Sequence, residues 1–362
     1  MEEFFSTNGN GKSYQKIGRN GYRNKIIKEK VLMINETIKR RIAEWLPYRA
    51  VKKKLEFSPQ LGQLAKESPQ LYNMYGEPMK MFFLKDKGCA HIPYTLSAGR
   101  FPRNIVWDRF NYALPIHFYT HSDIFDKLYE AEKRFALLRE SETILPGDFE
   151  RVLKQPEIVR DFDVVFTHST RILNKYENAK FIPASSVWYA TELNGGVMDA
   201  LNYQKKKKNI SIISSNKIMC KMHKFRIELA KKYIRDERVD TYGAVCSNYI
   251  EKKATALTDY RYSIVIENDI TEFYFTEKIM DCFAAMTVPI YIGAKRIGDF
   301  FNTDGIIQVM PAEYEHLDDI IKNCCNSDYN ERKEAIIDNF QRVQEYLCTE
   351  DYMMKHYGKL FE

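Results

Sequence analysis

The sequence lacks the signatures of several common protein classes. No apolar run reaches the roughly 18 residues that a membrane-spanning helix needs. The first residues, MEEFFSTNGNGKSYQ, contain no charged stretch followed by an apolar core, so we expect no signal peptide. The motifs of P-loop proteins, of dinucleotide-binding strand–helix turns and of zinc peptidases do not occur. These absences favour a cytoplasmic protein.

Cysteine is also scarce. The chain has seven cysteines in 362 residues, an odd number, and no C-x-x-C pair. Reduced thiols are the expected state, and a zinc site is not expected. One D-x-D sequence, Asp161 to Asp163, has the form of a metal-binding motif, but it precedes a candidate strand instead of ending one. We therefore expect no tightly bound cofactor and no required divalent metal.

Positive charge is concentrated at the start of the chain. Residues 1–56 carry 14 Lys and Arg but six Asp and Glu, whereas the formal net charge of the whole chain is +6. Apolar residues recur at helical intervals within 25–56, which predicts a basic amphipathic helix. Such a helix could bind an anionic membrane surface or a partner, or pack as an ordinary helix with a solvated basic face. Nucleic-acid binding is not expected, because the excess charge is local and no recognition motif accompanies it.

The second half of the chain has a regular pattern. After the run Lys205–Lys208, which we take as a linker and domain boundary, candidate strands alternate with candidate helices. Strands are expected at NISIISS, VDTYG, RYSIVIEN and TVPIYIG, and helices at KIMCKMHKFRIELAKKY, EKKATALTDY and TEKIMDCFAAM. Earlier in the chain, DIFDKLYEAEKRFALL is expected to be a helix and then a strand, and DVVFTH a strand. The alternation predicts βαβ units and a parallel sheet.

Polar residues gather where one of these strands meets a helix. Glu267 and Asn268 follow the strand RYSIVI, and ligands of open parallel sheets bind beyond such carboxyl ends. Thr276 is a candidate N-cap for a helix that begins with Glu-Lys, and helix N-termini attract anions. Lys278 and, on another helix, Arg226 would add positive charge suited to a pyrophosphate. Alternatively, these charges only decorate helix ends.

The stretch IENDITEFYFTEKIMDCFAAMTVPIYIG, from Ile266 to Gly293, resembles the bacterial-type α-1,3/4-fucosyltransferases of glycosyltransferase family ten. The upstream blocks NISIISSN, FRIELAKKY and VDTYG resemble the same family in the same order. Two positions depart from its pattern: Ile266 stands where the family has Phe, and Met286 where it has a small residue. Both changes are apolar and leave the charged residues in place.

The resemblance implies an α/β protein of the GT-B fold, with two Rossmann-like domains facing a central cleft. Its implied organisation is a basic segment (1–70), an acceptor-binding domain (71–205), a GDP-sugar-binding domain (206–330) and C-terminal helices (331–362). It further implies that Arg226 and Lys278 hold the GDP phosphates. Asn268, Tyr274 and Glu277 would line the rest of the nucleotide-sugar site.

The family's enzymes invert the anomeric carbon, which requires a base on the acceptor side. The segment FALLRESET offers Glu140, with Glu142 as the alternate; either could instead belong to a solvated turn, and His168 is a further candidate. The implied activity is transfer of L-fucose from GDP-β-L-fucose to an oligosaccharide or glycolipid, with α linkage (α-1,3 expected), in surface polysaccharide or lipopolysaccharide synthesis. Alternatives are another GDP-hexose as donor, or a non-catalytic nucleotide-sugar- or glycan-binding protein. The location would be cytoplasmic, peripheral on the inner face of the membrane if the basic helix binds lipid.

Overall fold

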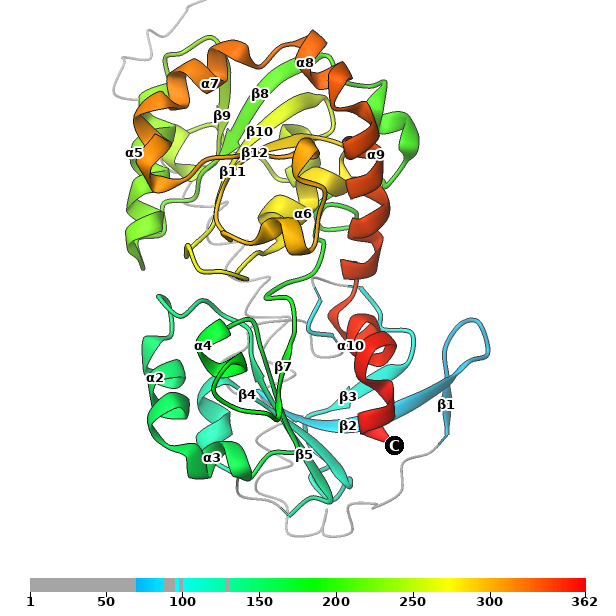
Figure 1. Ribbon diagram of the computed structural model, residues 1–362. Coiled ribbons are helices and arrows are strands. Elements are labelled where there is room, and N and C mark those ends of the chain that lie inside the picture. Colours follow the sequence, from blue (N-terminus) through cyan, green and yellow to red (C-terminus); the bar gives the residue numbers. More distant parts are fainter. Residues whose placement is uncertain (1–69, 87–94, 98–99, 128–129) are drawn as a thin grey trace, which may run out of the picture. The chain divides into compact units, whose positions relative to one another are not determined.

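Two β-sheets organise the part of the chain that the computed structural model describes, which comprises residues 70–86, 95–97, 100–127 and 130–362 (Figure 1). The predicted basic helix within 25–56 lies outside these residues. The predicted domain boundaries remain a prediction, although the strands of the first sheet fall within 71–181 and those of the second within 208–308.

The first sheet, within the described residues, has the order β1-β2-β4-β5-β6-β7, with β3 paired to β2, and only β1 runs antiparallel. Its strands are β1 (Leu71–Tyr72), β2 (Pro78–Lys85), β3 (Ile105–Asp108), β4 (Ile116–Thr120), β5 (Lys133–Leu138), β6 (Val164–Thr167) and β7 (Ala179–Phe181). Helices α2 (Pro146–Lys154), α3 (Pro156–Arg160) and α4 (Thr170–Leu173) follow β5 and β6.

The strand β5 shows why this sheet is covered on both faces. Its last four residues, FALL, are all buried, as is typical of a parallel strand between two layers. Side chains alternate between the faces of a strand. Accordingly, Ala136 and Leu138 join the cluster that contains α2 and α3, whereas Phe135 and Leu137 join the cluster on the other face.

The second sheet is entirely parallel in the described residues, with the order β12-β11-β10-β8-β9, which confirms the predicted βαβ pattern. Its strands are β8 (Lys208–Ile213), β9 (Val239–Tyr242), β10 (Tyr260–Ile266), β11 (Val288–Ile292) and β12 (Ile307–Gln308). The helices are α5 (Lys221–Tyr233), α6 (Glu277–Ala284), α7 (Leu317–Asn323), α8 (Asn326–Glu331) and α9 (Lys333–Arg342). Helices α5 and α7 share one apolar cluster with the sheet, and α6 packs in the other.

Two local expectations were wrong. The helix predicted over EKKATALTDY is only a short 3-10 turn, Lys253–Ala256, and Lys253 forms an ion pair with Asp281 of α6. The helix predicted before β5 is likewise a 3-10 turn, His121–Phe125. The linker predicted at the lysine run is anchored, since the buried ammonium of Lys206 donates hydrogen bonds to three carbonyl oxygens and the Thr287 hydroxyl.

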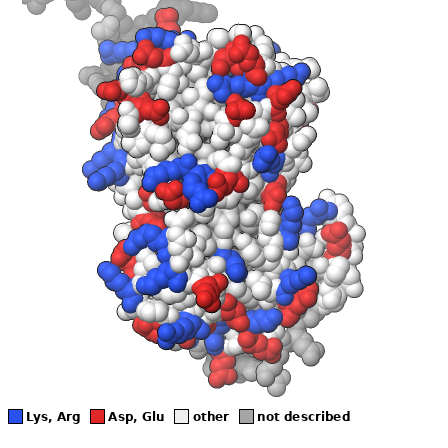
Figure 2. All heavy atoms as spheres, viewed as in Figure 1, with Lys and Arg blue, Asp and Glu red and all other residues white. Residues whose placement is uncertain are grey.

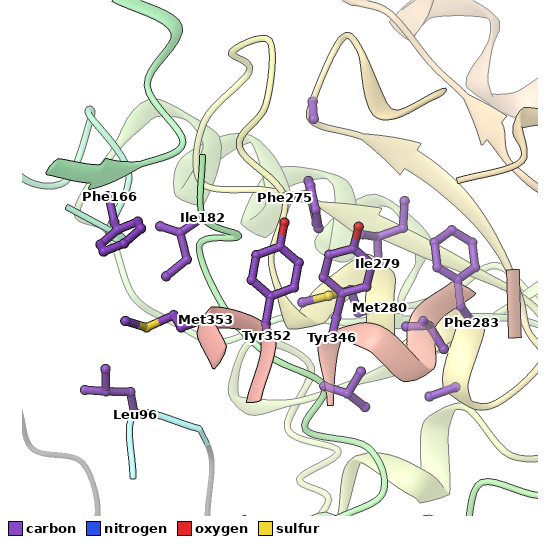
Figure 3. Packing of buried hydrophobic residues seen from close by; sticks show 14 of the residues in the cluster. Leu96, Phe166, Ile182, Phe275, Ile279, Met280, Phe283, Tyr346, Tyr352 and Met353 are labelled. Atoms are coloured by element: carbon purple, nitrogen blue, oxygen red, sulfur yellow. The ribbon is translucent and has the colours of Figure 1, made fainter. Parts of the chain in front are cut away.

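The end of the chain returns to the first sheet. After α9, helix α10 (Thr349–Tyr357) places Tyr352 and Met353 in the cluster that also contains Phe166 of β6 and Ile279 of α6 (Figure 3). The ring of Phe361 packs edge-on against Phe135 of β5, with ring centroids 5.0 Å apart. One continuous apolar core therefore involves strands of the first sheet, helix α6 of the second and the C-terminal helix.

Candidate functional site

The carboxyl end of β10 begins the candidate site. Glu267, Asn268 and Asp269 follow its last residue, and Arg226 lies on the helix that follows the neighbouring strand β8. Because β8 and β10 are parallel neighbours, their carboxyl ends share one edge of the sheet. Ligands of open parallel sheets bind at such an edge.

Glu267 is fully buried and fastens the loop after β10 to the start of α6. Its carboxylate accepts hydrogen bonds from the backbone N–H of Thr276 at 2.9 Å and from the Thr276 hydroxyl at 2.7 Å. The Thr276 hydroxyl accepts the backbone N–H of Lys278 at 3.4 Å, which is the predicted N-cap. A Cβ at Gly293 would lie 2.7 Å from the Glu267 side chain, so glycine is required beside it. Much of the polarity of this loop therefore serves the fold.

Helix α6 begins in a network of alternating charges. The ammonium of Lys278 lies 3.1 Å from Glu267 and 3.8 Å from Glu277, and that of Lys253 lies 3.6 Å from Glu277 and 2.9 Å from Asp281. Burial raises the pKa of Glu277, but Lys278 and Lys253 together lower it to about 2. Burial lowers the pKa of Lys278, but the carboxylates of Glu267 and Glu277 raise it above its usual value. The opposite charges thus favour the ionised forms of Glu277 and Lys278.

Lys253 and Asp281 were not found by sequence analysis, although they connect this network to the chain that leaves the first sheet. Asp281 accepts the backbone N–H groups of Trp188 and Tyr189, each at 2.7 Å. The Lys253 ammonium lies 4.6 Å from the centre of the Trp188 ring. The sequence shows only an acidic residue inside an apolar helix, and a buried partner could have been suspected from that alone.

Arg226 differs from the other charged residues of this network, because it is buried without a carboxylate in direct contact. It is 7% exposed, and its Nη1 donates to the carbonyl oxygen of Ile266 at 3.3 Å. Its Nε has no hydrogen-bond partner, and no carboxylate of the described residues lies within ion-pair distance. Burial lowers the pKa of Arg226, although the charges of Glu267 and Glu277 oppose this effect. A buried guanidinium with free donors is suited to an anionic ligand.

Asn268 is held by a histidine that sequence analysis did not single out. The His223 Nδ1 accepts the backbone N–H of Met219 at 3.1 Å, so its Nε2 carries the proton and donates to the Asn268 side-chain oxygen at 2.9 Å. The Asn268 carbonyl oxygen accepts the Thr143 hydroxyl at 3.1 Å. Asn268 thus joins the segment before α5 to the loop after β5.

Tyr274 and Glu140 meet across the two sheets. The Tyr274 side chain is buried, and its hydroxyl donates to Glu140 Oε1 at 3.3 Å. Glu140 is partly exposed at the carboxyl end of β5 and also accepts the backbone N–H of Ser141 at 2.8 Å. His168, after β6, donates from Nε2 to the Glu140 carbonyl oxygen at 2.8 Å, and its ring lies against that of Tyr274. Three of the predicted residues thus adjoin one another.

The two candidate bases have different surroundings. Glu142 lies 2.9 Å from Arg171 in an ion pair and also accepts the Ser169 hydroxyl. Glu140, by contrast, has no cation within ion-pair distance among the described residues. Both carboxylate oxygens of Glu142 are thus engaged by neighbouring side chains, Oε1 by Ser169 and Oε2 by Arg171. The surroundings therefore favour Glu140 over Glu142 as a base.

The remaining candidates have structural partners. Asp161 pairs with Lys127, and Asp163 accepts the backbone N–H of Arg134 at 2.7 Å. Among the described residues, no group of three or more His, Cys, Asp or Glu side chains is arranged to hold a metal ion. In the same part of the chain, no helix is long and apolar enough to span a bilayer. On the face shown in Figure 2, Lys and Arg are interspersed with Asp and Glu.

Comparison with known proteins finds a family similar to the part of the chain that holds the second sheet. Residues 203–335 match the model of the C-terminal domain of glycosyltransferase family 10 (fucosyltransferase). A fucosyltransferase-like protein of Arabidopsis thaliana is 31% identical over 84 residues, which are 22% of this chain and 16% of that protein. The chain therefore spans about a sixth of the length of the curated relative it matches.

Solved structures resemble a larger part of the chain. The HepE protein of Anabaena, in complex with UDP and glucose, aligns with 78% of this chain and 100% of that chain, at 10% identity and a TM-score of 0.50. An α1,3-fucosyltransferase with GDP aligns with 79% of this chain and 93% of that chain, at 14% identity and a TM-score of 0.46. The likeness to HepE concerns the fold alone, and it confirms the expected α/β fold of the GT-B type.

Proposed function

We propose that this protein is an inverting glycosyltransferase that moves L-fucose from GDP-β-L-fucose to a hydroxyl group of a glycan, forming an α linkage, with α-1,3 the expected position. The match to the family 10 model supports fucosyl transfer. The acceptor is an oligosaccharide or a glycolipid, as in the synthesis of a surface polysaccharide or lipopolysaccharide.

The observation that carries this proposal is the buried guanidinium of Arg226. Transferring a charge from water into a protein is costly unless the charge is paired. Arg226 has one carbonyl partner and no carboxylate within ion-pair distance among the described residues, so its guanidinium keeps donor capacity for an anionic ligand. The positive charge of Lys278 lies close enough to act on that of Arg226. A diphosphate at the edge of the second sheet would satisfy both.

Glu140 would act on the other substrate. The acceptor oxygen forms a bond to the anomeric carbon while the bond from that carbon to GDP breaks, and Glu140 takes the hydroxyl proton. GDP leaves with the bonding electrons, and Arg226 and Lys278 stabilise its developing negative charge. The contact between Tyr274 and Glu140 supports this assignment, because it brings the candidate base to a residue of the donor loop. Asn268 and Glu277 line the same region in the proposal.

Nucleotide binding tests the donor site directly. A ligand that binds the folded state raises the melting temperature by mass action. GDP should raise it markedly, and UDP or CMP should raise it much less, because family 10 is a family of fucosyltransferases and fucose is carried on GDP. An equal shift with UDP would exclude the proposed donor.

Turnover measurements test the identity of the donor sugar and whether the protein is catalytic. GDP release should be measured with GDP-fucose and other GDP-hexoses, each with and without neutral oligosaccharides. If glycan stimulates GDP release only when GDP-fucose is the donor, the result supports the proposal. If glycan stimulates release from a different GDP-hexose, that sugar is the donor instead. Tight GDP binding without any glycan-dependent release would indicate a non-catalytic binding protein.

The proposal assigns neutralisation of the leaving diphosphate to Arg226 and Lys278, so transfer should not need a divalent metal. Turnover in excess EDTA should match turnover in Mg²⁺, and a large loss on chelation would contradict this assignment.

Peripheral membrane binding is a separate part of the proposal and rests on the sequence of residues 25–56. The full chain should co-sediment with anionic vesicles at low salt and less at high salt, since salt screens such attraction. Deletion of these residues should abolish co-sedimentation and keep soluble transfer; an unfolded deletion variant would show instead that the helix packs on the fold.

A further inference from the structure

Polar residues form a row along the carboxyl edge of the first sheet, beyond the candidate base. The strands of this region neighbour one another in the order β3, β2, β4, β5. These strands run parallel, so their carboxyl ends share one edge. The residues just past those ends are Arg109, Asp86, His121 and, one residue further, Glu140. Their order in space follows the strand order, so the row leads away from Glu140.

The far end of the row is a buried ion pair with donor capacity left over. The Nη2 of Arg109 lies 3.5 Å from Asp86 Oδ2, and the two side chains are 7% and 3% exposed. Asp86 Oδ1 also accepts the Thr120 hydroxyl at 2.9 Å. The Nη1 of Arg109 is buried and has no hydrogen-bond partner among the described residues. Because buried donors are nearly always paired, this atom indicates a place for a polar ligand.

His121 occupies the middle of the row in a strained conformation. Its φ is 47°, in the left-handed region that residues other than glycine seldom adopt. Its Nδ1 is buried and lacks a hydrogen-bond partner in the described part of the chain. Burial lowers the pKa of His121 to about 4, while the carboxylates of Glu140 and Asp86, which are close enough to act on it, oppose the effect. The imidazole is therefore neutral at pH 7, with one nitrogen that donates and one that accepts. Backbone strain of this kind is often retained at functional sites.

We propose that Arg109, Asp86 and His121 form a subsite for the second sugar residue of a neutral acceptor oligosaccharide. The inference rests on the proposed transfer reaction and deepens it. Sugar hydroxyl groups both donate and accept, and the row offers both capacities: Arg109 Nη1 donates, Asp86 accepts, and His121 can do either. The ion pair of Arg109 and Asp86 carries no net charge, which favours a neutral sugar over an acidic one.

The spacing of the strands supports an acceptor of more than one residue. Neighbouring strands lie about 4.8 Å apart, so the strand of Arg109 is about 14 Å from that of Glu140. One sugar ring beside Glu140 cannot reach Arg109, whereas a second ring attached to it can.

The test compares a monosaccharide with a disaccharide acceptor. Transfer from GDP-fucose to methyl glycosides of neutral hexoses and to disaccharides of the same hexoses should be measured as kcat/KM. Wild-type protein should favour the disaccharide by about tenfold or more, as expected for two or three additional hydrogen bonds. A disaccharide that ends in a uronic acid should lose this advantage. No preference for any neutral disaccharide would overturn the proposal.

His121→Gly separates recognition from folding. Glycine adopts a positive φ freely, so this variant should melt at or near the wild-type temperature while its preference for the disaccharide falls by about fivefold. Ser247→Gly is the matched control, because Ser247 also has a positive φ (54°) but is exposed and follows β9 in the second sheet. It should keep the full preference. An unchanged preference in a folded His121→Gly variant would refute the subsite.

The double variant Asp86→Asn, Arg109→Gln removes both charges together, so that no buried charge is left unpaired. The double variant should use disaccharide and monosaccharide acceptors with nearly equal kcat/KM. GDP should still raise its melting temperature. A wild-type protein that shows neither GDP binding nor transfer would refute the underlying function; active wild-type protein whose variants keep the preference would refute only the subsite.

Discussion

The two sheets carry polar residues at the same edge but satisfy them in different ways. In the second sheet, Glu267, Lys278, Glu277, Lys253 and Asp281 form a chain of ion pairs, and the unmatched group is the guanidinium of Arg226. In the first sheet, the charged pair of Asp86 and Arg109 is neutral, and unmatched nitrogens remain on Arg109 and His121. An edge with unused guanidinium donors suits a diphosphate, and an edge with unmatched nitrogens beside a neutral ion pair suits a sugar. The two edges are thus chemically distinct.

The largest effect is expected from Glu140→Gln. Glutamine keeps the size and hydrogen bonding of the side chain but cannot take the acceptor proton, so transfer should fall by roughly 10² to 10⁴-fold. The rise in melting temperature with GDP should stay the same, because the change lies at the edge of the first sheet. Transfer rates and thermal shifts check both statements.

Glu142→Gln is the control for that experiment. It removes an ion pair with Arg171, so a small loss of stability and a milder loss of transfer are expected. The reverse ranking of the two variants would move the base to Glu142. Normal transfer in both would direct attention to His168.

Two separate variants, Arg226→Gln beside the second sheet and Arg109→Gln beside the first, should distinguish the two sheet edges. Arg226→Gln should weaken GDP binding by roughly 10- to 100-fold, the value of a charge-assisted hydrogen bond. It should change the melting temperature of the ligand-free protein little, since burial disfavours the Arg226 charge while Glu267 and Glu277 favour it. Arg109→Gln, by contrast, should destabilise the ligand-free fold by about 3 kcal/mol, because it leaves the buried carboxylate of Asp86 unpaired. Calorimetric titration and chemical unfolding measure these effects, and identical behaviour of both variants would abolish the distinction.

A smaller effect is expected at His223. His223→Ala should raise the apparent KM for the GDP-sugar about fivefold, because Asn268 and the backbone of Met219 lose a shared partner. His223→Gln can donate to one and accept from the other, and should restore most of the affinity. Equal defects in both variants would show that His223 acts by packing alone.

Stability should fall markedly in mildly acidic solution, mainly because of buried histidines in the first sheet. Burial lowers the pKa values of His117 and His121 to about 4, whereas unfolded histidines titrate near 6.5. Between these values the unfolded chain binds more protons than the folded one, so stability falls as pH decreases from about 6.5 to 4. The melting temperature of His117→Gln should fall less steeply over that interval than that of the wild type. Parallel curves would contradict the assignment.

The candidate donor site was largely predictable, because its residues lie in a short stretch of chain. The parallel strands, the N-cap Thr276 and the position of Arg226 after β8 all follow from local patterns of apolar and polar residues. The roles proposed for the site residues remain predictions. The helix predicted over EKKATALTDY was wrong: Lys253 lies in a short 3-10 turn and pairs with a distant carboxylate, Asp281. A weak local helix preference is readily overridden by tertiary contacts.

The sequence by itself determined the strands β8 to β11, the helices α5 and α6 and the residues that meet at the edge of that sheet. Periodic burial and capping act over a few residues, so they can be read locally. Only the tertiary structure decided which charges pair and which stay unmatched. Arg226 and Lys278 look alike in the sequence, yet Glu267 neutralises one and no described carboxylate pairs with the other. The row from Glu140 to Arg109 likewise draws on four strands, and strand order is set by packing between distant segments.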